Sequence, residues 1–305
     1  MTRTRANALL LFAGAIWGMG FVAQSTAMDH IGPLTFVAVR FAIATLVLIP
    51  FAFVETQSKV RNETDAPVDL RVLGRFALIG VAMFAGMATQ QVGLLTTTVS
   101  NSGFLTGLYV VFTPLVAVLL FRDHVHPVVW PGASLALLGI FLLSGGDLAA
   151  LVIGDLLTMV GAVCWAVQAV LIARHVNASG RPLLLAATQF ATVCVLAVVG
   201  VVIAGERSSV DALMQAAPQL LYTGIIAGAL AFTLQIVGQR YTSASQAVIF
   251  LSSEAPFAAL FGALVLGERL GILGVFGCAA ILASMLLVEL VPGLKDRRRS
   301  REAPG

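Results

Sequence analysis

The second half of this chain repeats the first, and this duplication limits its possible folds more than any other feature. Residues 90–139 match residues 235–284 at an offset of 145 (235 − 90 = 145), and earlier stretches match at 148 (165 − 17 = 148) or 149 (182 − 33 = 149). We call two residues matched in this way repeat mates. The mates are Asn7 and Asp155, Trp17 and Trp165, Pro33 and Pro182, Arg40 and Gln189, Phe41 and Phe190, Gln90 and Gln235, Gly93 and Gly238, Thr97 and Thr242, Ser100 and Ser245, Asn101 and Gln246, Asp123 and Glu268, Gly132 and Gly277, and Gly139 and Ser284. Because such repeats share one fold, we expect two similar halves.

One feature breaks this register. Pro114 and Pro256 are 142 residues apart (256 − 114 = 142), so the prolines of the two halves are about one helical turn out of step. A pocket between the halves therefore cannot be predicted by assuming that the two halves match throughout.

The composition indicates a membrane protein. Hydrophobic residues make up 59% of the chain and charged residues only 11%, with a mean hydropathy of +0.97. A soluble domain has about a quarter charged residues, so a soluble fold is excluded. The cysteines Cys164, Cys194 and Cys278 lie within apolar runs, where we expect small buried side chains rather than a disulfide or a metal site.

The apolar segments are long enough for ten membrane-spanning helices, each of which needs about 20 mostly apolar residues. The polar cluster 96–102 divides one uncharged run into a third and a fourth span. The expected spans are Ala6–Met28, Pro33–Phe53, two within Phe76–Phe121, Val128–Gly145, Leu156–Ala173, Pro182–Ala204, Ala216–Val237, Ala244–Leu266 and Leu270–Val288. The sequence thus predicts an all-α membrane protein of ten transmembrane helices, with five-helix repeats at 6–145 and 152–290 and a basic tail at 291–305.

Basic residues gather on one side of these spans. With the N-terminus inside, 15 of the 18 Lys and Arg residues fall on the cytoplasmic side, whereas Arg207 and Arg269 fall outside and Arg40 lies within the second span. Because positive charge in short loops sets orientation, we expect an integral protein of the bacterial inner (plasma) membrane with both termini in the cytoplasm. We interpret the cluster Lys295–Arg301 as an anchor at anionic lipids rather than as a nucleic-acid site.

The odd number of spans in each repeat has a functional consequence. After five spans the second repeat begins on the opposite side of the membrane, so the two repeats are inverted. Inverted repeats that meet at the membrane midplane are a transporter architecture, in which the exchange of their conformations gives alternating access. The chain has no Gly-x-x-x-x-Gly-Lys-[Ser/Thr] loop, so no ATP-driven step is expected.

Several short motifs resemble those of the drug/metabolite transporter superfamily, EamA type. They are Gly14–Gly18, Arg40–Phe41, Thr97–Val111, Tyr241–Ser245, and Gly267–Leu270 followed by Gly277. The resemblance covers both halves, from about Ala6 to Val288. It implies an exporter or permease for amino acids, metabolites or drugs, and it does not imply one particular substrate.

Glu254 is the candidate proton-coupling residue, because it is predicted about ten residues into the ninth span, near the middle of the bilayer. An ionisable side chain at this depth costs at least ~2.5 kcal/mol and normally faces a cavity. There it would bind and release a proton or balance the charge of a substrate amine. The alternative is a buried carboxyl that a neighbour such as Arg40 satisfies. Its repeat mate is Tyr109 (254 − 145 = 109), so the two halves differ at this level.

Arg40 is a candidate for an ion pair or an anion site. It lies seven residues from the start of the second span (40 − 33 = 7), about 10 Å deep, and its mate Gln189 is uncharged. The alternative is a structural partner or an anchor that reaches back to the membrane interface.

Polar and aromatic side chains on the matched spans complete the predicted site. Amides inside lipid-embedded helices need partners, so they either line a polar cavity or bond between helices, and the tryptophans either form its walls or pack. The expected substrate-binding residues are Trp17, Gln90, Asn101, Tyr109, Trp165, Gln235 and Glu254.

These features together predict a secondary active transporter that exports amino acids or related metabolites by alternating access, with coupling to protons. The alternatives are a uniporter or an exchanger for drugs or for phosphorylated or nucleotide-linked sugars, a passive channel, and an intramembrane enzyme. The enzyme is disfavoured because the histidines and aspartates fall at helix ends, away from any nucleophile at membrane depth. We expect no cofactor and no metal, since His124 and His126 lack a third ligand. The expected partners are a small-molecule substrate and the lipid bilayer, without nucleic acid, and association of two copies stays open.

Overall fold

The computed structural model describes residues 1–61, 68–97, 102, 105–143, 152–266 and 271–302, and this part of the chain is helical without strands. Seven of its helices are long and apolar enough to cross a membrane, and three shorter apolar helices bring the number to ten. The expected all-α membrane fold is therefore confirmed. The elements are α1 (Arg3–Ala27), α2 (Pro33–Arg61), α3 (Leu70–Gly93), α5 (Tyr109–Leu119), α6 (Val129–Leu143), α7 (Ile153–Ser179), α8 (Pro182–Ala204), α9 (Val210–Gln215), α10 (Ala217–Leu221), η1 (Tyr222–Leu230), α11 (Ala231–Gln239), α12 (Ala244–Leu251), α13 (Glu254–Leu266) and α14 (Ile272–Glu302).

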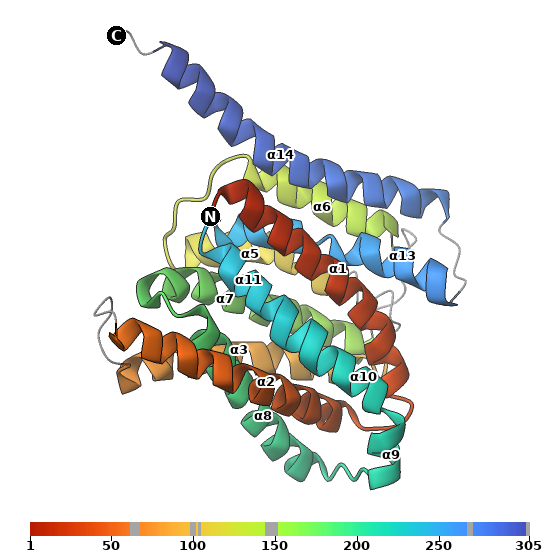
Figure 1. Cartoon of the computed structure of the whole chain (residues 1–305). Helices are drawn as coiled ribbons and strands as arrows, with labels where there is room; N and C mark the ends of the chain where they lie inside the picture. Colours follow the sequence, from red (N-terminus) through yellow and green to blue (C-terminus); the bar gives the residue numbers. More distant parts are fainter. Residues whose placement is uncertain (62–67, 98–101, 103–104, 144–151, 267–270, 303–305) are drawn as a thin grey trace.

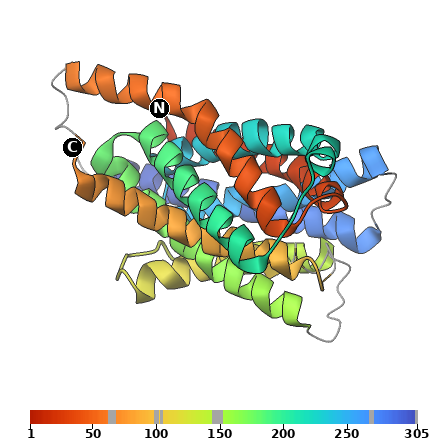
Figure 2. The same cartoon turned by 90° about the horizontal axis from the view of Figure 1, so that it is seen from below.

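The helices of the two repeats pack against each other. Figure 1 shows α6 alongside α14 at one edge of the bundle and α2 with α8 at the other, and α3 packs along α7 in the same way. In Figure 2 α8 runs between α2 and α3. The hydrophobic core therefore lies between the repeats, where the mates Phe41 and Phe190 are fully buried with ring centroids 5.4 Å apart.

The helices α2 and α8 cap each other. Glu206, just after α8, accepts hydrogen bonds from two backbone N–H groups at the start of α2, at 3.1 and 2.8 Å, and from the Thr35 hydroxyl at 2.8 Å. Glu55 in α2 accepts from the backbone N–H groups of Leu183 and Leu184 in α8, at 3.1 and 3.0 Å. A carboxylate at a helix N-terminus satisfies its free N–H groups and its dipole. The reciprocal caps show that α2 and α8 run antiparallel, as inverted repeats require.

The fourth span of each repeat is broken at the same level. In the second repeat a two-residue interruption before Glu254 separates α12 from α13, because Pro256 has no N–H to continue the helix. In the first repeat a turn at Leu108 precedes α5, which begins at Tyr109. Adding 145 to Leu108 gives Ser253, so the breaks are in register although the prolines are not.

The eighth span differs from the single helix that the sequence predicts. It consists of α10, the nine-residue π-helix η1 and α11. The matching part of the first repeat lies within the regular helix α3. π-Helical turns are rare in proteins, and those that occur are often found at functional sites. The space beside η1 is therefore a candidate for the functional site.

Candidate substrate-binding site

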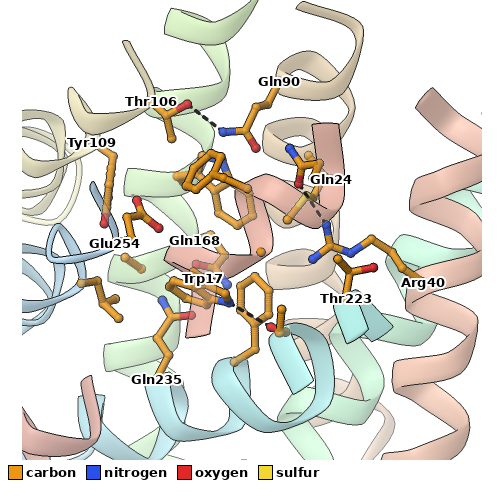
Figure 3. Close-up of a pocket in the computed structure, with 18 residues that line it drawn as sticks. Trp17, Gln24, Arg40, Gln90, Thr106, Tyr109, Gln168, Thr223, Gln235 and Glu254 are labelled. Carbon is orange, nitrogen blue, oxygen red and sulfur yellow. Dashed lines mark hydrogen bonds between the residues drawn. The ribbon is translucent and has the colours of Figure 1, made fainter. Parts of the chain in front are cut away.

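A cavity lies between the two repeats, beside the breaks in the fourth spans (Figure 3). Helices of both repeats contribute to its walls. The residues that line it are Trp17, Gly20, Phe21, Gln24, Arg40, Met87, Gln90, Thr106, Tyr109, Trp165, Gln168, Ala169, Thr223, Ala227, Phe232, Gln235, Leu251 and Glu254.

Most of this lining is built from repeat mates. Fourteen of the 18 residues form seven matched pairs, so equivalent positions of the two repeats meet across one space. Gln24, Arg40, Thr223 and Ala227 also line it, whereas their mates do not. The cavity thus has a matched part and a one-sided part. The seven pairs are Trp17 and Trp165, Gly20 and Gln168, Phe21 and Ala169, Met87 and Phe232, Gln90 and Gln235, Thr106 and Leu251, and Tyr109 and Glu254.

Aromatic rings form one wall of the cavity. Phe232 lies between the two tryptophans, with ring centroids 4.6 Å from Trp17 and 6.2 Å from Trp165. The Trp17 Nε1–H donates to the backbone carbonyl of Ala227 in η1 at 2.9 Å, and the Tyr222 hydroxyl donates to the carbonyl of Ile16 at 2.9 Å. Trp17 therefore both lines the cavity and links α1 to the π-helix.

Glu254 begins α13 and faces the cavity half-buried. The hydroxyl of its mate Tyr109 lies close enough to interact with its carboxylate, and Figure 3 shows the two side chains side by side. The alternative pairing with Arg40 is not formed: no ion pair joins Glu254 and Arg40, both of which lie in the described part of the chain. Among the described residues, the Glu254 carboxylate thus faces the cavity without a cationic partner.

The amides of the cavity are only partly satisfied by the protein. Gln90 Nε2 donates to the Thr106 hydroxyl at 2.7 Å, and Gln168 Nε2 donates to Gln189 Oε1 at 3.4 Å. The buried Oε1 atoms of Gln168 and Gln235 have no hydrogen-bond partner among the described residues. Buried polar atoms normally have partners, so these oxygens are suited to accept hydrogen bonds from a bound molecule.

Arg40 reaches the cavity from α2. Its side chain is 3% exposed, and its Nη1 donates to Gln24 Oε1 at 3.3 Å. The guanidinium lies over the rings of Phe36 and Phe41, at 5.3 and 5.0 Å from their centroids. Arg40 is therefore buried inside the bundle, and its role in an ion pair or an anion site stays a prediction.

The structure brings together seven of the eight predicted site residues: Trp17, Arg40, Gln90, Tyr109, Trp165, Gln235 and Glu254. The eighth, Asn101, lies outside the described residues. Sequence reasoning missed the lining residues Gln24, Thr106, Gln168, Thr223 and Phe232. Gln24 and Gln168 were detectable, because each is an amide within an apolar span, as Gln90 is. Phe232 carries no such signal among 18 phenylalanines.

The lining combines one carboxylate, one guanidinium, four amides and a wall of aromatic rings. These groups suit the binding of a small organic molecule that has both charged and apolar parts. Within the part of the chain that the structure describes, no three His, Cys, Asp or Glu side chains are close enough to hold a metal ion.

Comparison with known proteins agrees with this architecture. The sequence model of the EamA-like transporter family matches residues 4–145 and again residues 152–290. An uncharacterized transporter of Archaeoglobus fulgidus is 32% identical over 288 residues, which cover 94% of this chain and 87% of that protein. A crystal structure of a protein with 18% identity superposes with a TM-score of 0.76, over 95% of this chain and 99% of the other. At that identity the last likeness shows the fold alone.

Proposed function

Because the chain belongs to the EamA-like transporter family, we propose that it is a secondary active transporter that exports amino acids or related small metabolites in exchange for protons. The family and the apolar helices make it an integral membrane protein. On the distribution of its basic residues, we place it in a bacterial inner membrane with both termini in the cytoplasm.

The observation that carries proton coupling is the position of Glu254. This carboxylate begins a helix segment at a break in the ninth span and faces the cavity between inverted repeats. Broken helices at the interface of such repeats are typical of substrate and ion sites in secondary transporters. The titratable groups that line the cavity with it are Tyr109 and Arg40.

In the proposed cycle the Glu254 carboxylate binds a proton and the ammonium group of the substrate in turn. Open to the cytoplasm, Glu254 releases its proton and binds the ammonium group of the substrate, with the free oxygens of Gln168 and Gln235 as further acceptors. Open to the outside, a proton replaces the ammonium group and the substrate leaves. Because the site holds a proton or a substrate but not both, entry of a proton drives export of a substrate.

The test is export from cells that overproduce the protein, with amino acids and small metabolites measured in the medium at a higher and a lower external pH. We expect selective accumulation that is faster at the lower pH, because external protons displace the substrate. Glu254→Gln cannot exchange a proton, and we expect it to lose pH-dependent export. Glu206→Gln is the matched control, because this carboxylate caps α2 outside the cavity, and it should export like the wild type.

Two outcomes contradict the proposal in different ways. A Glu254→Gln variant with full, pH-dependent export would remove this residue as the coupling group and leave the exporter. No accumulation with the wild type would point to a uniporter or an exchanger. Counterflow in proteoliposomes, in which unlabelled solute on one side accelerates entry of label, would then be measured.

A further inference from the structure

Arg40 holds a buried positive charge that no carboxylate in the described part of the chain neutralises. Among the described residues, its buried Nε atom has no hydrogen-bond partner, and its side chain donates a hydrogen bond to the neutral Gln24. No carboxylate among the described residues pairs with it. A charge inside a membrane protein is costly and normally has a partner or faces a substrate pathway. The contacts with Phe36 and Phe41 offset only a part of this cost.

The second repeat shows that this charge is not needed to hold the helices together. Arg40 links the first and second helices of its repeat through Gln24. In the second repeat the mate of Arg40, Gln189, links the corresponding two helices by accepting a hydrogen bond from Gln168 at 3.4 Å, about one helical turn from the mate of Gln24. A neutral amide therefore suffices for the structural contact. The guanidinium adds a charge and further donors, and it faces the cavity, which its mate does not line.

The surroundings of Arg40 form a distinct end of the cavity. Arg40, Gln24 and Thr223 all belong to the one-sided part of the lining, and Figure 3 shows them grouped together. Glu254 lies on the other side of the same view. Because the Gln24 carbonyl accepts from the guanidinium, the amide nitrogen of Gln24 remains as a further donor at this end.

We propose that Arg40 and the Gln24 amide form a subsite for the carboxylate of the transported molecule, while Glu254 holds its ammonium group. This inference rests on the proposed function, because it takes the cavity as the substrate site. A guanidinium binds a carboxylate or a phosphate through two parallel hydrogen bonds. Because a single arginine beside neutral groups balances one negative charge, a carboxylate is favoured over a phosphate. The substrate is then a zwitterion whose apolar part contacts the aromatic wall.

Four probes with a common phenyl group test the subsite on the purified full-length protein in lipid nanodiscs. L-phenylalanine carries both charges, phenethylamine lacks the carboxylate, 3-phenylpropanoate lacks the amine, and phenyl phosphate replaces the carboxylate by a phosphate. Arg40→Gln installs the residue of the second repeat. We expect this variant to bind L-phenylalanine and 3-phenylpropanoate about 30-fold more weakly or worse, and phenethylamine as the wild type does. Glu254→Gln should weaken phenethylamine and leave 3-phenylpropanoate unchanged.

Two further variants keep the test decisive. Arg40→Lys retains the charge but not the two parallel donors, so it should bind 3-phenylpropanoate with an affinity between those of the wild type and Arg40→Gln. Asp211→Asn changes an exposed side chain of α9 outside the cavity, and it should leave all affinities within about twofold.

The possible results separate the subsite from the proposed function. If Arg40→Gln weakens L-phenylalanine and phenethylamine equally, or neither, the carboxylate subsite is overturned and the transporter stays. Tighter binding of phenyl phosphate than of 3-phenylpropanoate would overturn the carboxylate in favour of a phosphate. If the wild type binds no probe and cells export nothing, the substrate site itself is wrong, and the subsite is overturned with it.

Discussion

The two repeats have similar helix caps but bring different charged groups to the cavity. In the packing, Glu206 caps α2 at one end of the α2/α8 pair and Glu55 caps α8 at the other end. In the cavity, Glu254 faces its uncharged mate Tyr109. Similarly, the charged Arg40 lines the cavity and its neutral mate does not.

This difference separates two requirements of a transporter. Inverted repeats give alternating access by exchanging conformations, and equal packing contacts keep the two conformations close in free energy. A small substrate with unlike ends needs unlike groups around it. The charged residues of the cavity therefore differ between mates, whereas the helix caps do not.

The largest effect is expected from moving the carboxylate between the repeats. Glu254→Tyr would leave a tyrosine on both sides of the cavity and abolish pH-dependent export. Adding Tyr109→Glu returns a carboxylate from the opposite wall, because the two side chains lie side by side (Figure 3). Since misplacing a catalytic or binding group by about 1 Å can cost 10²-fold, we expect the double variant to export at about 1–10% of the wild-type rate.

The readout is export at a lower and a higher external pH. Tyr109→Phe with Glu254 intact is the control for loss of the hydroxyl alone, and it should keep pH-dependent export. If the double variant is as inactive as Glu254→Tyr, the carboxylate works from the second repeat only, and the two walls are not interchangeable.

A smaller effect is expected from substituting a glycine of α1, the helix that packs against α13. In α7, the matching helix of the second repeat, an alanine occupies the corresponding position. Gly18 corresponds to Ala166 in α7 (166 − 18 = 148). A Cβ atom at Gly18 would lie 2.6 Å from the Phe257 Cβ and 2.7 Å from the backbone nitrogen of Ala258. Because overpacking displaces helices, Gly18→Ala should lower the free energy of unfolding by about 1–3 kcal/mol.

Thermal unfolding of the purified protein in detergent measures this effect. Gly74→Ala is the control, because a Cβ atom at Gly74 meets nothing within 4 Å. It should be neutral, or stabilising by up to about 1 kcal/mol through helix propensity. Equal stability of the two variants would show that α1 and α13 are not in close contact.

The transmembrane helices and most of the polar residues of the cavity can be recognised in the sequence for a physical reason. A span of about 20 apolar residues is a strong signal, and the duplication gives it twice. A polar side chain in such a span must have a partner or a cavity, and the structure brings Arg40, Gln90, Gln235 and Glu254 to the lining of one cavity. Their assignment to a substrate stays a prediction.

Features that depend on the packing of distant helices could not be predicted. The π-helix η1 has an apolar sequence like that of the α-helical stretch that matches it, and it is held by hydrogen bonds from Trp17 and to Ile16, residues more than 200 positions away. The one-sided lining by Gln24 and Thr223 depends on how each helix is rotated in the bundle. Helix rotation is set by neighbouring helices, which local sequence does not describe.

The smallest effect is expected at the helix caps, and it should be similar in the two repeats. Glu206→Gln and Glu55→Gln each keep an acceptor oxygen but remove the negative charge from a helix N-terminus. Each should lower the free energy of unfolding by about 0.3–1 kcal/mol, with pH-dependent export retained. Thermal unfolding is the measurement, and Asp211→Asn on the exposed surface of α9 is the control. A cost at only one cap would mean that the packing contacts differ between the repeats as the cavity does, because only equivalent caps lose the same interaction when the charge is removed.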